Sequence, residues 1–331
     1  MAGRRRSHPA QYSLVVSYWL SGDYATNQQL TISNRQLKDS ACTFVEGRTA
    51  LYSYFFILRL TMTVNEFFEL LLNELRSNQH LTSYYKFLEN PASFEFRKSY
   101  VTQRLHYILD HLPNPEAAIW DCGCGYGTTA IFLALNGYKV HGTTLEFYFK
   151  HIPERLRYWS QFGDVSGFTY SYENLFDSPP APASYDHVII QDTLHHLEPL
   201  QDALRIFHTA LKPAGNLIIV EENGGNVVQN LKLYLRRGNK RIIEIYDEQL
   251  QKNILLGNEN IRNLATWRRE LAKQHLHIYP ANVQYIRLFP PFMFKDGNSQ
   301  QVMARESRLW RRNALLKEKL FFGLNFVAGK G

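Results

Sequence analysis

The spacing of apolar residues predicts two helices followed by a regular alternation of strands and helices. Thr63 is a suitable N-cap for a helix whose apolar positions, Phe67 to Leu75, recur at helical spacing, and residues 99–111 repeat this pattern. From residue 117 onward, short apolar runs alternate with helical segments. Strands are expected at 117–120, 139–143, 167–171, 185–191 and 216–221, and helices at 128–136, 147–162 and 200–211. This alternation predicts an α/β fold whose doubly wound, mostly parallel sheet carries helices on both faces.

The same pattern divides the chain into five segments. They are an N-terminal extension at 1–61, N-terminal helices at 62–112, a core at 113–225, a basic helical insert at 226–280, and a C-terminal segment at 281–331. The last segment supplies two strands, near 283–289 and 320–327, that bring the expected sheet to seven strands. An insert before the last strands is a natural place for a lid over a ligand.

Residues 1–61 keep neither the helix nor the strand period, whereas Met62 opens a well-patterned helical segment. We hypothesise that Met62 is the natural start and that the first 61 residues are not part of the native protein. Intact mass spectrometry of the natively expressed protein would contradict this by detecting Met1.

Charge and cysteine content narrow the class of protein. Lys plus Arg exceeds Asp plus Glu by 37 − 30 = 7 over the 331 residues, and residues 1–61 hold four of these net charges. Nucleic-acid binders concentrate charge on their working face, so a nucleic-acid partner is not expected. Cys42, Cys122 and Cys124 cannot form a disulfide scaffold, which favours a reducing, cytoplasmic location. No apolar run has the length of a transmembrane segment.

A glycine-rich loop, Asp121-Cys122-Gly123-Cys124-Gly125-Tyr126-Gly127, lies between the first core strand and the helix after it. Glycines admit positive φ and let a ligand approach the backbone closely. The dinucleotide fingerprint G-x-G-x-x-G does not fit, because its third glycine would fall on Thr128. The carboxylate of Asp121 would also repel a pyrophosphate, whereas a ligand with ammonium and sulfonium groups would be attracted.

The order of the motifs resembles class I S-adenosylmethionine-dependent methyltransferases, and in particular the ubiquinone- and menaquinone-biosynthesis group. The resemblance covers about residues 99–222. Its landmarks are the glycine loop, Tyr185-Asp186, Leu194-His195-His196-Leu197, and Leu211-Lys212-Pro213-Ala214-Gly215. It implies a Rossmann-like fold with S-adenosyl-L-methionine as the cofactor.

The resemblance also implies which positions bind this cofactor. They are Asp121, Gly123, Cys124, Gly125, Gly127, Thr144, Leu145, Glu146, Ser171, Tyr172 and Gln191. Asp121 would lie near the ammonium group, the glycines near the methionine portion and ribose, and Gln191 beside the methionine portion. The acidic residue that usually grips the ribose is replaced by Thr144. Either Glu146 reaches back to the ribose, or Thr144 binds one hydroxyl.

Candidate catalytic groups follow the fourth and fifth strands. They are His195, His196 and Glu222, with Asp192 and Glu221 as neighbours. A histidine is suited to acid–base work because its unperturbed pKa is about 6.5. Cys122 and Cys124 have no second cysteine pair that would complete a zinc site, so no metal is expected.

These features predict methyl transfer to a small-molecule or lipid-like acceptor, at oxygen or carbon. The basic insert, with Arg236, Arg237, Lys240 and Arg241, leaves several interpretations open. It is a solvated cap, a binder of an acidic or phosphorylated acceptor, or a surface for anionic lipid or nucleic acid. Two alternative functions remain: an RNA- or protein-modifying methyltransferase that docks through the insert, and a non-catalytic cofactor-binding relative.

Overall fold

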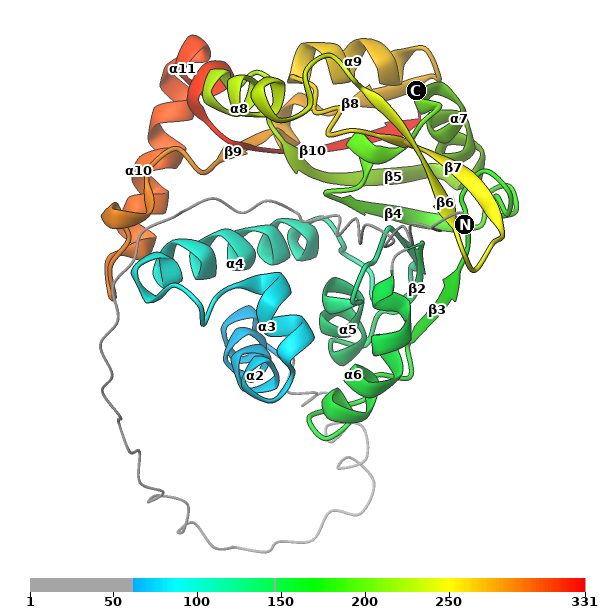
Figure 1. Cartoon of the computed structure of the whole chain (residues 1–331), viewed down its shortest axis with the longest axis horizontal. Coiled ribbons are helices and arrows are strands. Elements are labelled where there is room, and N and C mark those ends of the chain that lie inside the picture. Colours follow the sequence, from blue (N-terminus) through cyan, green and yellow to red (C-terminus); the bar gives the residue numbers. More distant parts are fainter. Residues whose placement is uncertain (1–61, 146, 331) are drawn as a thin grey trace, which may run out of the picture.

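The computed structural model describes residues 62–145 and 147–330 (Figure 1). The expectations for residues 1–61, including a start at Met62, and for Glu146 lie outside the described residues. The centre of the protein is an eight-stranded sheet with the order β3-β2-β1-β4-β5-β10-β8, and β9 also pairs with β10.

Five neighbouring strands of this sheet are parallel, and the C-terminal strand reverses direction. β1 to β5 pair with one another in parallel, whereas β10 runs antiparallel to β5. β8 pairs with the end of β10 and β9 with its beginning, so two short strands share one edge. This sharing gives eight strands where seven were expected, while the predicted mostly parallel α/β sheet is confirmed. Its strands are β1 Ala118–Cys122, β2 Lys139–Thr144, β3 Phe168–Tyr172, β4 Tyr185–Gln191, β5 Leu211–Glu222, β8 Leu276–Ile278, β9 Gln284–Ile286 and β10 Gly323–Lys330.

Helices cover both faces of the sheet, and a separate apolar core lies under each layer (Figure 1). One core is formed with α2 Val64–Ser77, α4 Phe94–Asp110, α5 Thr128–Leu135 and α6 Ile152–Trp159, and α3 Gln79–Tyr85 lies beside them. The other is formed with α7 Leu200–Ala210 and α9 Leu264–Ala272. Thr63 caps α2 as predicted, because its side chain accepts a hydrogen bond from the Glu66 N–H. Within the described residues, no helix has the length and apolar character needed to cross a bilayer.

The insert at 226–280 is not mostly helical as expected. Between α8 Val227–Arg237 and α9 it forms an antiparallel hairpin of β6 Ile242–Asp247 and β7 Lys252–Gly257. The exposure of successive residues over Ile242–Asp247 alternates with the two-residue period of a strand. The C-terminal segment likewise holds two helices that the apolar pattern did not predict, α10 Ser299–Arg312 and α11 Ala314–Leu320.

A buried ion pair joins the N-terminal helices to the core. Glu74 of α2 and Arg155 of α6 are 3% and 0% exposed, and two hydrogen bonds of 2.8 and 2.6 Å connect them. Arg155 also donates to the Tyr126 carbonyl oxygen at 2.8 Å, so the pair reaches the glycine loop. Trp159 Nε1 donates to the second Glu74 oxygen at 2.9 Å. The pair is therefore fully hydrogen-bonded, as buried charges must be.

We expect Glu74→Ala to lower the free energy of unfolding by about 3–5 kcal/mol, because it leaves the Arg155 charge buried without a partner. Urea unfolding followed by circular dichroism measures the change. Glu69→Ala on the same helix is the matched control: its ion pair with Lys98 is exposed, and its loss should cost no more than about 1 kcal/mol. Equal effects of the two variants would contradict the role assigned to the buried pair.

Candidate active site

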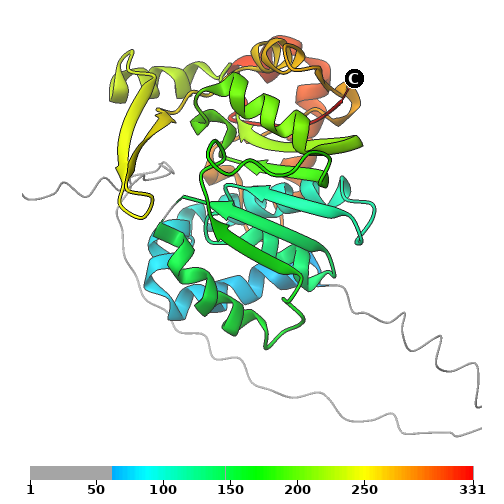
Figure 2. The ribbon, with the colours of Figure 1, turned by 90° about the vertical axis from the view of Figure 1, so that its right-hand side faces the viewer.

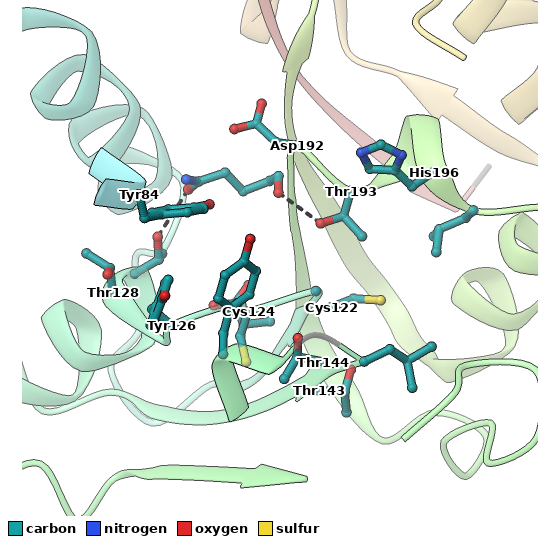
Figure 3. A pocket seen from close by; sticks show the side chains of 18 of the residues that line it. Tyr84, Cys122, Cys124, Tyr126, Thr128, Thr143, Thr144, Asp192, Thr193 and His196 are labelled. Atoms are coloured by element: carbon teal, nitrogen blue, oxygen red, sulfur yellow. Dashed lines mark hydrogen bonds between the residues drawn. The ribbon is translucent and has the colours of Figure 1, made fainter. Parts of the chain in front are cut away.

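A cavity lies where the carboxyl ends of β1, β2 and β4 meet. Pairing of Asp121 with Gly142 and with Ile189 brings these strand ends together. Asp121 to Tyr126, Thr128 and Thr129 line one side of the cavity. Figure 3 shows Asp192, Thr193 and His196 across from Cys124 and Tyr126. A cavity at the carboxyl ends of the strands is the position at which open α/β sheets bind ligands.

All three glycines of the loop have a positive φ, and two of them also leave no space for a side chain. Gly123 and Gly127 have φ of +82° and +72°, a region that side chains disfavour. A Cβ atom on Gly123 would lie 2.3 Å from Thr193 Oγ1, and one on Gly127 would lie 2.6 Å from the Phe168 ring. The loop therefore turns tightly against β3 and against the turn after β4. At Gly125 a Cβ would meet only Tyr148, at 3.9 Å.

Asp121 is a buried carboxyl group in the cavity wall that is suited to bind a cationic ligand. Its side chain is 2% exposed and lines the cavity, and within the described residues its Oδ2 atom has no hydrogen-bond partner. Burial raises the pKa of this carboxyl group to about 7. A buried polar atom without a partner is rare in folded proteins and needs an explanation. An ammonium group of a bound ligand would satisfy it.

The end of β2 matches the expectation only in part. Thr144 and Leu145 line the cavity. Ser171 and Tyr172 lie outside its lining: Ser171 Oγ bonds to His141 Nε2 at 3.2 Å, and the Tyr172 hydroxyl donates to Asp247 at 2.6 Å. The next four residues of the chain, 173–176, line the cavity in their place. The cavity wall after β3 therefore lies one to four residues beyond Tyr172 in the chain.

Two further expected cofactor residues lie on the cavity wall. Gln191, at the end of β4, accepts a hydrogen bond from Thr129 Oγ1 at 3.1 Å, and Cys124 lies in the glycine loop. Burial raises the pKa of the Cys124 thiol well above its ordinary value, and the same holds for Cys122. Both thiols therefore stay protonated at neutral pH and are poor nucleophiles.

Of the three predicted catalytic residues, only His196 lines the cavity. Its Nδ1 lies 2.8 Å from the Gly257 carbonyl oxygen, which can only accept, so Nδ1 carries the proton and Nε2 has the lone pair. Burial and the neighbouring His195 charge lower the pKa of His196 to about 4. His196 is therefore a neutral hydrogen-bond acceptor at physiological pH.

His195 belongs to a charge network behind the cavity wall. Its Nδ1 lies 2.5 Å from Glu221 Oε2, and its Nε2 lies 3.7 Å from Glu259 Oε2. Burial opposes the imidazolium form, but the two carboxylates prevail and raise the pKa of His195 to about 9. One ring nitrogen of His195, one of His196 and a carboxylate oxygen of Glu259 lie within 4.8 Å of one another, which is a spacing that metal ligands can have. Among these groups, the protonated His195 ring carries the positive charge.

Glu222 also lies outside the cavity lining. Its carboxylate accepts a hydrogen bond from Gln229 Nε2 and lies 3.9 Å from Arg287 Nη1. Burial raises the pKa of Glu222 to about 7. The charged residue that does border the cavity here is Asp192, which forms a 2.5 Å ion pair with Arg104 of α4.

The sequence pattern did not identify the part of the cavity wall that the N-terminal helices and the hairpin form. Residues from the N-terminal helices line it, together with 254–256 of the hairpin: Tyr84, Tyr85, Phe87, Arg97, Tyr100, Val101, Arg104 and Leu105. The aromatic run Tyr84-Tyr85-Lys86-Phe87 was the available signal, because it spans the end of α3 and continues past it.

Comparison with known proteins agrees with this geometry. Residues 120–219 match the family described as Methyltransferase domain. O-methyltransferase resE of Aspergillus sclerotiorum is 28% identical over 104 residues, which cover 31% of this chain. The chain spans about two fifths of the length of that relative, 39%.

Solved structures with a similar fold include a geranyl diphosphate methyltransferase in complex with SAM. It is 16% identical with a TM-score of 0.48, over 72% of this chain and 91% of that one. YcgJ of Bacillus subtilis is 12% identical with a TM-score of 0.47, over 69% of this chain and 98% of that one.

The matched domain over residues 120–219, the sheet and the glycine loop together support a Rossmann-like, class I S-adenosylmethionine-dependent methyltransferase. S-adenosyl-L-methionine is the cofactor of this class. The narrower resemblance to the ubiquinone- and menaquinone-biosynthesis group stays a prediction.

We expect the affinity for S-adenosylmethionine to rise as the pH increases from 6 to 7.5, across the pKa of about 7 at Asp121. Below this pKa the carboxyl group is neutral and cannot pair with the ligand's ammonium. Asp121→Asn should weaken binding by about 10- to 100-fold and abolish the pH dependence. Isothermal titration calorimetry measures both, with Asp202→Asn on the exposed face of α7 as the control. A pH-independent affinity in the unaltered protein would contradict this role.

Proposed function

We propose that the protein transfers the methyl group of S-adenosylmethionine to a hydroxyl oxygen of an apolar small-molecule or lipid-like acceptor. The observation that carries the proposal is the pairing of an aromatic and aliphatic cavity wall with one neutral imidazole, His196. The name of the O-methyltransferase relative agrees with the choice of oxygen.

The wall opposite β4 favours an apolar acceptor. Tyr84, Tyr126 and Tyr148 pack against one another with ring centroids 4.4–5.2 Å apart. Ile254, Leu255 and Leu256 of β7 add aliphatic surface. Such walls bind by apolar burial, while a few polar groups orient the ligand.

His196 is the group we assign to the acceptor hydroxyl. S-adenosylmethionine supplies an electrophilic methyl group on a sulfonium. The Nε2 lone pair of His196 accepts the hydroxyl hydrogen and so orients the oxygen. The hydroxyl proton becomes strongly acidic only as its oxygen bonds to carbon, so a base with a pKa of about 4 is sufficient to take it. Alignment then supplies most of the rate.

The charges of the insert give less support to a nucleic-acid or protein acceptor. Arg236 forms an ion pair with Glu259, and Arg269 forms one with Glu270. An acidic acceptor would instead meet Arg97 and Arg104, which line the cavity and are nearly buried.

Methyl transfer from labelled S-adenosylmethionine tests the proposal. The acceptors are a panel of phenols and long-chain alcohols, with amines of matched size, and mass spectrometry locates the added methyl group. We expect product with the apolar hydroxyl compounds. Label that enters only the amines would contradict transfer to oxygen. In parallel reactions with total RNA and with protein as acceptors, label there would favour the RNA- or protein-modifying alternative, and cofactor binding without turnover would favour the non-catalytic one.

We expect His196→Ala to lower kcat by about 10²- to 10⁴-fold while cofactor affinity is retained. The unaltered enzyme should keep its kcat from pH 8 down to about 5 and lose it only near the His196 pKa of about 4. The exposed His106→Ala is the matched control. A kcat that already falls near pH 6.5, or that survives His196→Ala, would contradict the assignment.

A further inference from the structure

Exposed apolar side chains gather on one part of the described surface. Eight of the thirteen large hydrophobic side chains that are exposed lie between residues 227 and 255, in α8 and the β6–β7 hairpin. Leu235 and Leu231 are 76% and 59% exposed. A patch of this kind marks an interaction site.

The apolar face of helix α8 is exposed, whereas a surface helix in water normally buries its apolar face. Leu233 is its one buried residue and faces the protein. Val227, Leu231, Tyr234 and Leu235 follow the i, i+4, i+7, i+8 spacing of a single face, and all four are exposed. A surface helix normally turns polar residues to this side.

Positive charge accompanies this face. Residues 227–257, which include α8 and the hairpin, contain six basic and three acidic residues, and all three acidic residues lie in the hairpin half, at 244–248. Lys232 and Arg236 border the apolar face of α8, and Lys240 and Arg241 follow its end, both exposed. A helix with an apolar face and a basic border is typical of segments that lie in the interface of an anionic bilayer.

The same surface continues into the wall of the cavity. Figure 2 shows the hairpin standing away from the sheet, with α8 leading into it. Leu255 is 46% exposed and also lines the cavity, next to Ile254 and Leu256. Ile242 and Tyr246 extend the exposed apolar area along β6.

We propose that α8 and the β6–β7 hairpin form a docking surface for the interface of an anionic lipid bilayer. The leucines of α8 enter the headgroup region, and the flanking lysine and arginine side chains contact lipid phosphates. Charge complementarity selects this occupant over a second copy of the chain, whose basic residues would repel its own. Entry of an acceptor from the bilayer past Leu255 rests on the proposed function, whereas docking itself does not.

Vesicle co-sedimentation of the full chain, without cofactor or acceptor, tests docking. We expect binding to phosphatidylcholine vesicles that contain phosphatidylglycerol, little binding to phosphatidylcholine alone, and a steep loss with added salt. Leu231→Ser with Leu235→Ser should weaken binding by about 100-fold. Lys240→Glu with Arg241→Glu should weaken it by at least about 10-fold. Phe292→Ser, at a side chain that is 75% exposed elsewhere, is the matched control.

Several results would overturn the proposal. They are equal binding to neutral and anionic vesicles, binding that the double variants leave unchanged, and no binding at all. A dimer that the leucine variant dissociates, without vesicle binding, would show a contact between copies instead. Methyl transfer to a detergent-dispersed acceptor should be unchanged in both double variants, so a failure of docking and a failure of the proposed activity are distinguishable.

Discussion

The ion pair between Glu74 and Arg155 is the interaction on which the site depends. Arg155 donates to the Tyr126 carbonyl and to Thr128 Oγ1, and the same Oγ1 contacts the Tyr85 hydroxyl. One buried charge pair thereby fixes the glycine loop, the start of α5 and the end of α3 relative to one another. The aromatic wall and the cofactor loop are thus held as one unit, although more than forty residues separate Tyr85 from Thr128.

The parts of the site that the sequence predicted are those set by local structure. The glycine loop follows from the positive φ of Gly123 and Gly127, and the strand pattern follows from apolar periodicity over a few residues. Asp121 could be predicted because it precedes the loop directly in a buried strand. The α/β class and the cofactor class rest on these local signals.

The parts that the sequence did not predict depend on contacts between distant segments. Which of two adjacent histidines borders the cavity is decided by the short turn after β4 and by Gly257, some sixty residues later. Ser171 and Tyr172 lie outside the cavity lining, and their side chains bond to His141 and Asp247. The hairpin was mistaken for helix because charged and apolar residues of its short strands also fit a helical period.

The insert packs directly on the turn after β4 that carries His195 and His196. The Asn260 N–H donates to the His195 carbonyl at 3.2 Å, and Leu256 bridges to Leu197. A Cβ atom on Gly257 would lie 2.3 Å from the His195 carbonyl oxygen, so β7 packs directly on this turn. A displacement of β7 would stretch the hydrogen bond that sets the tautomer of His196. The outer surface of the hairpin and the His196 side chain in the cavity wall are therefore linked through one strand. Leu255 belongs both to the cavity wall and to the exposed apolar surface of the hairpin. With that surface docked on a bilayer as proposed, an apolar acceptor would pass from the lipid into the cavity without crossing water.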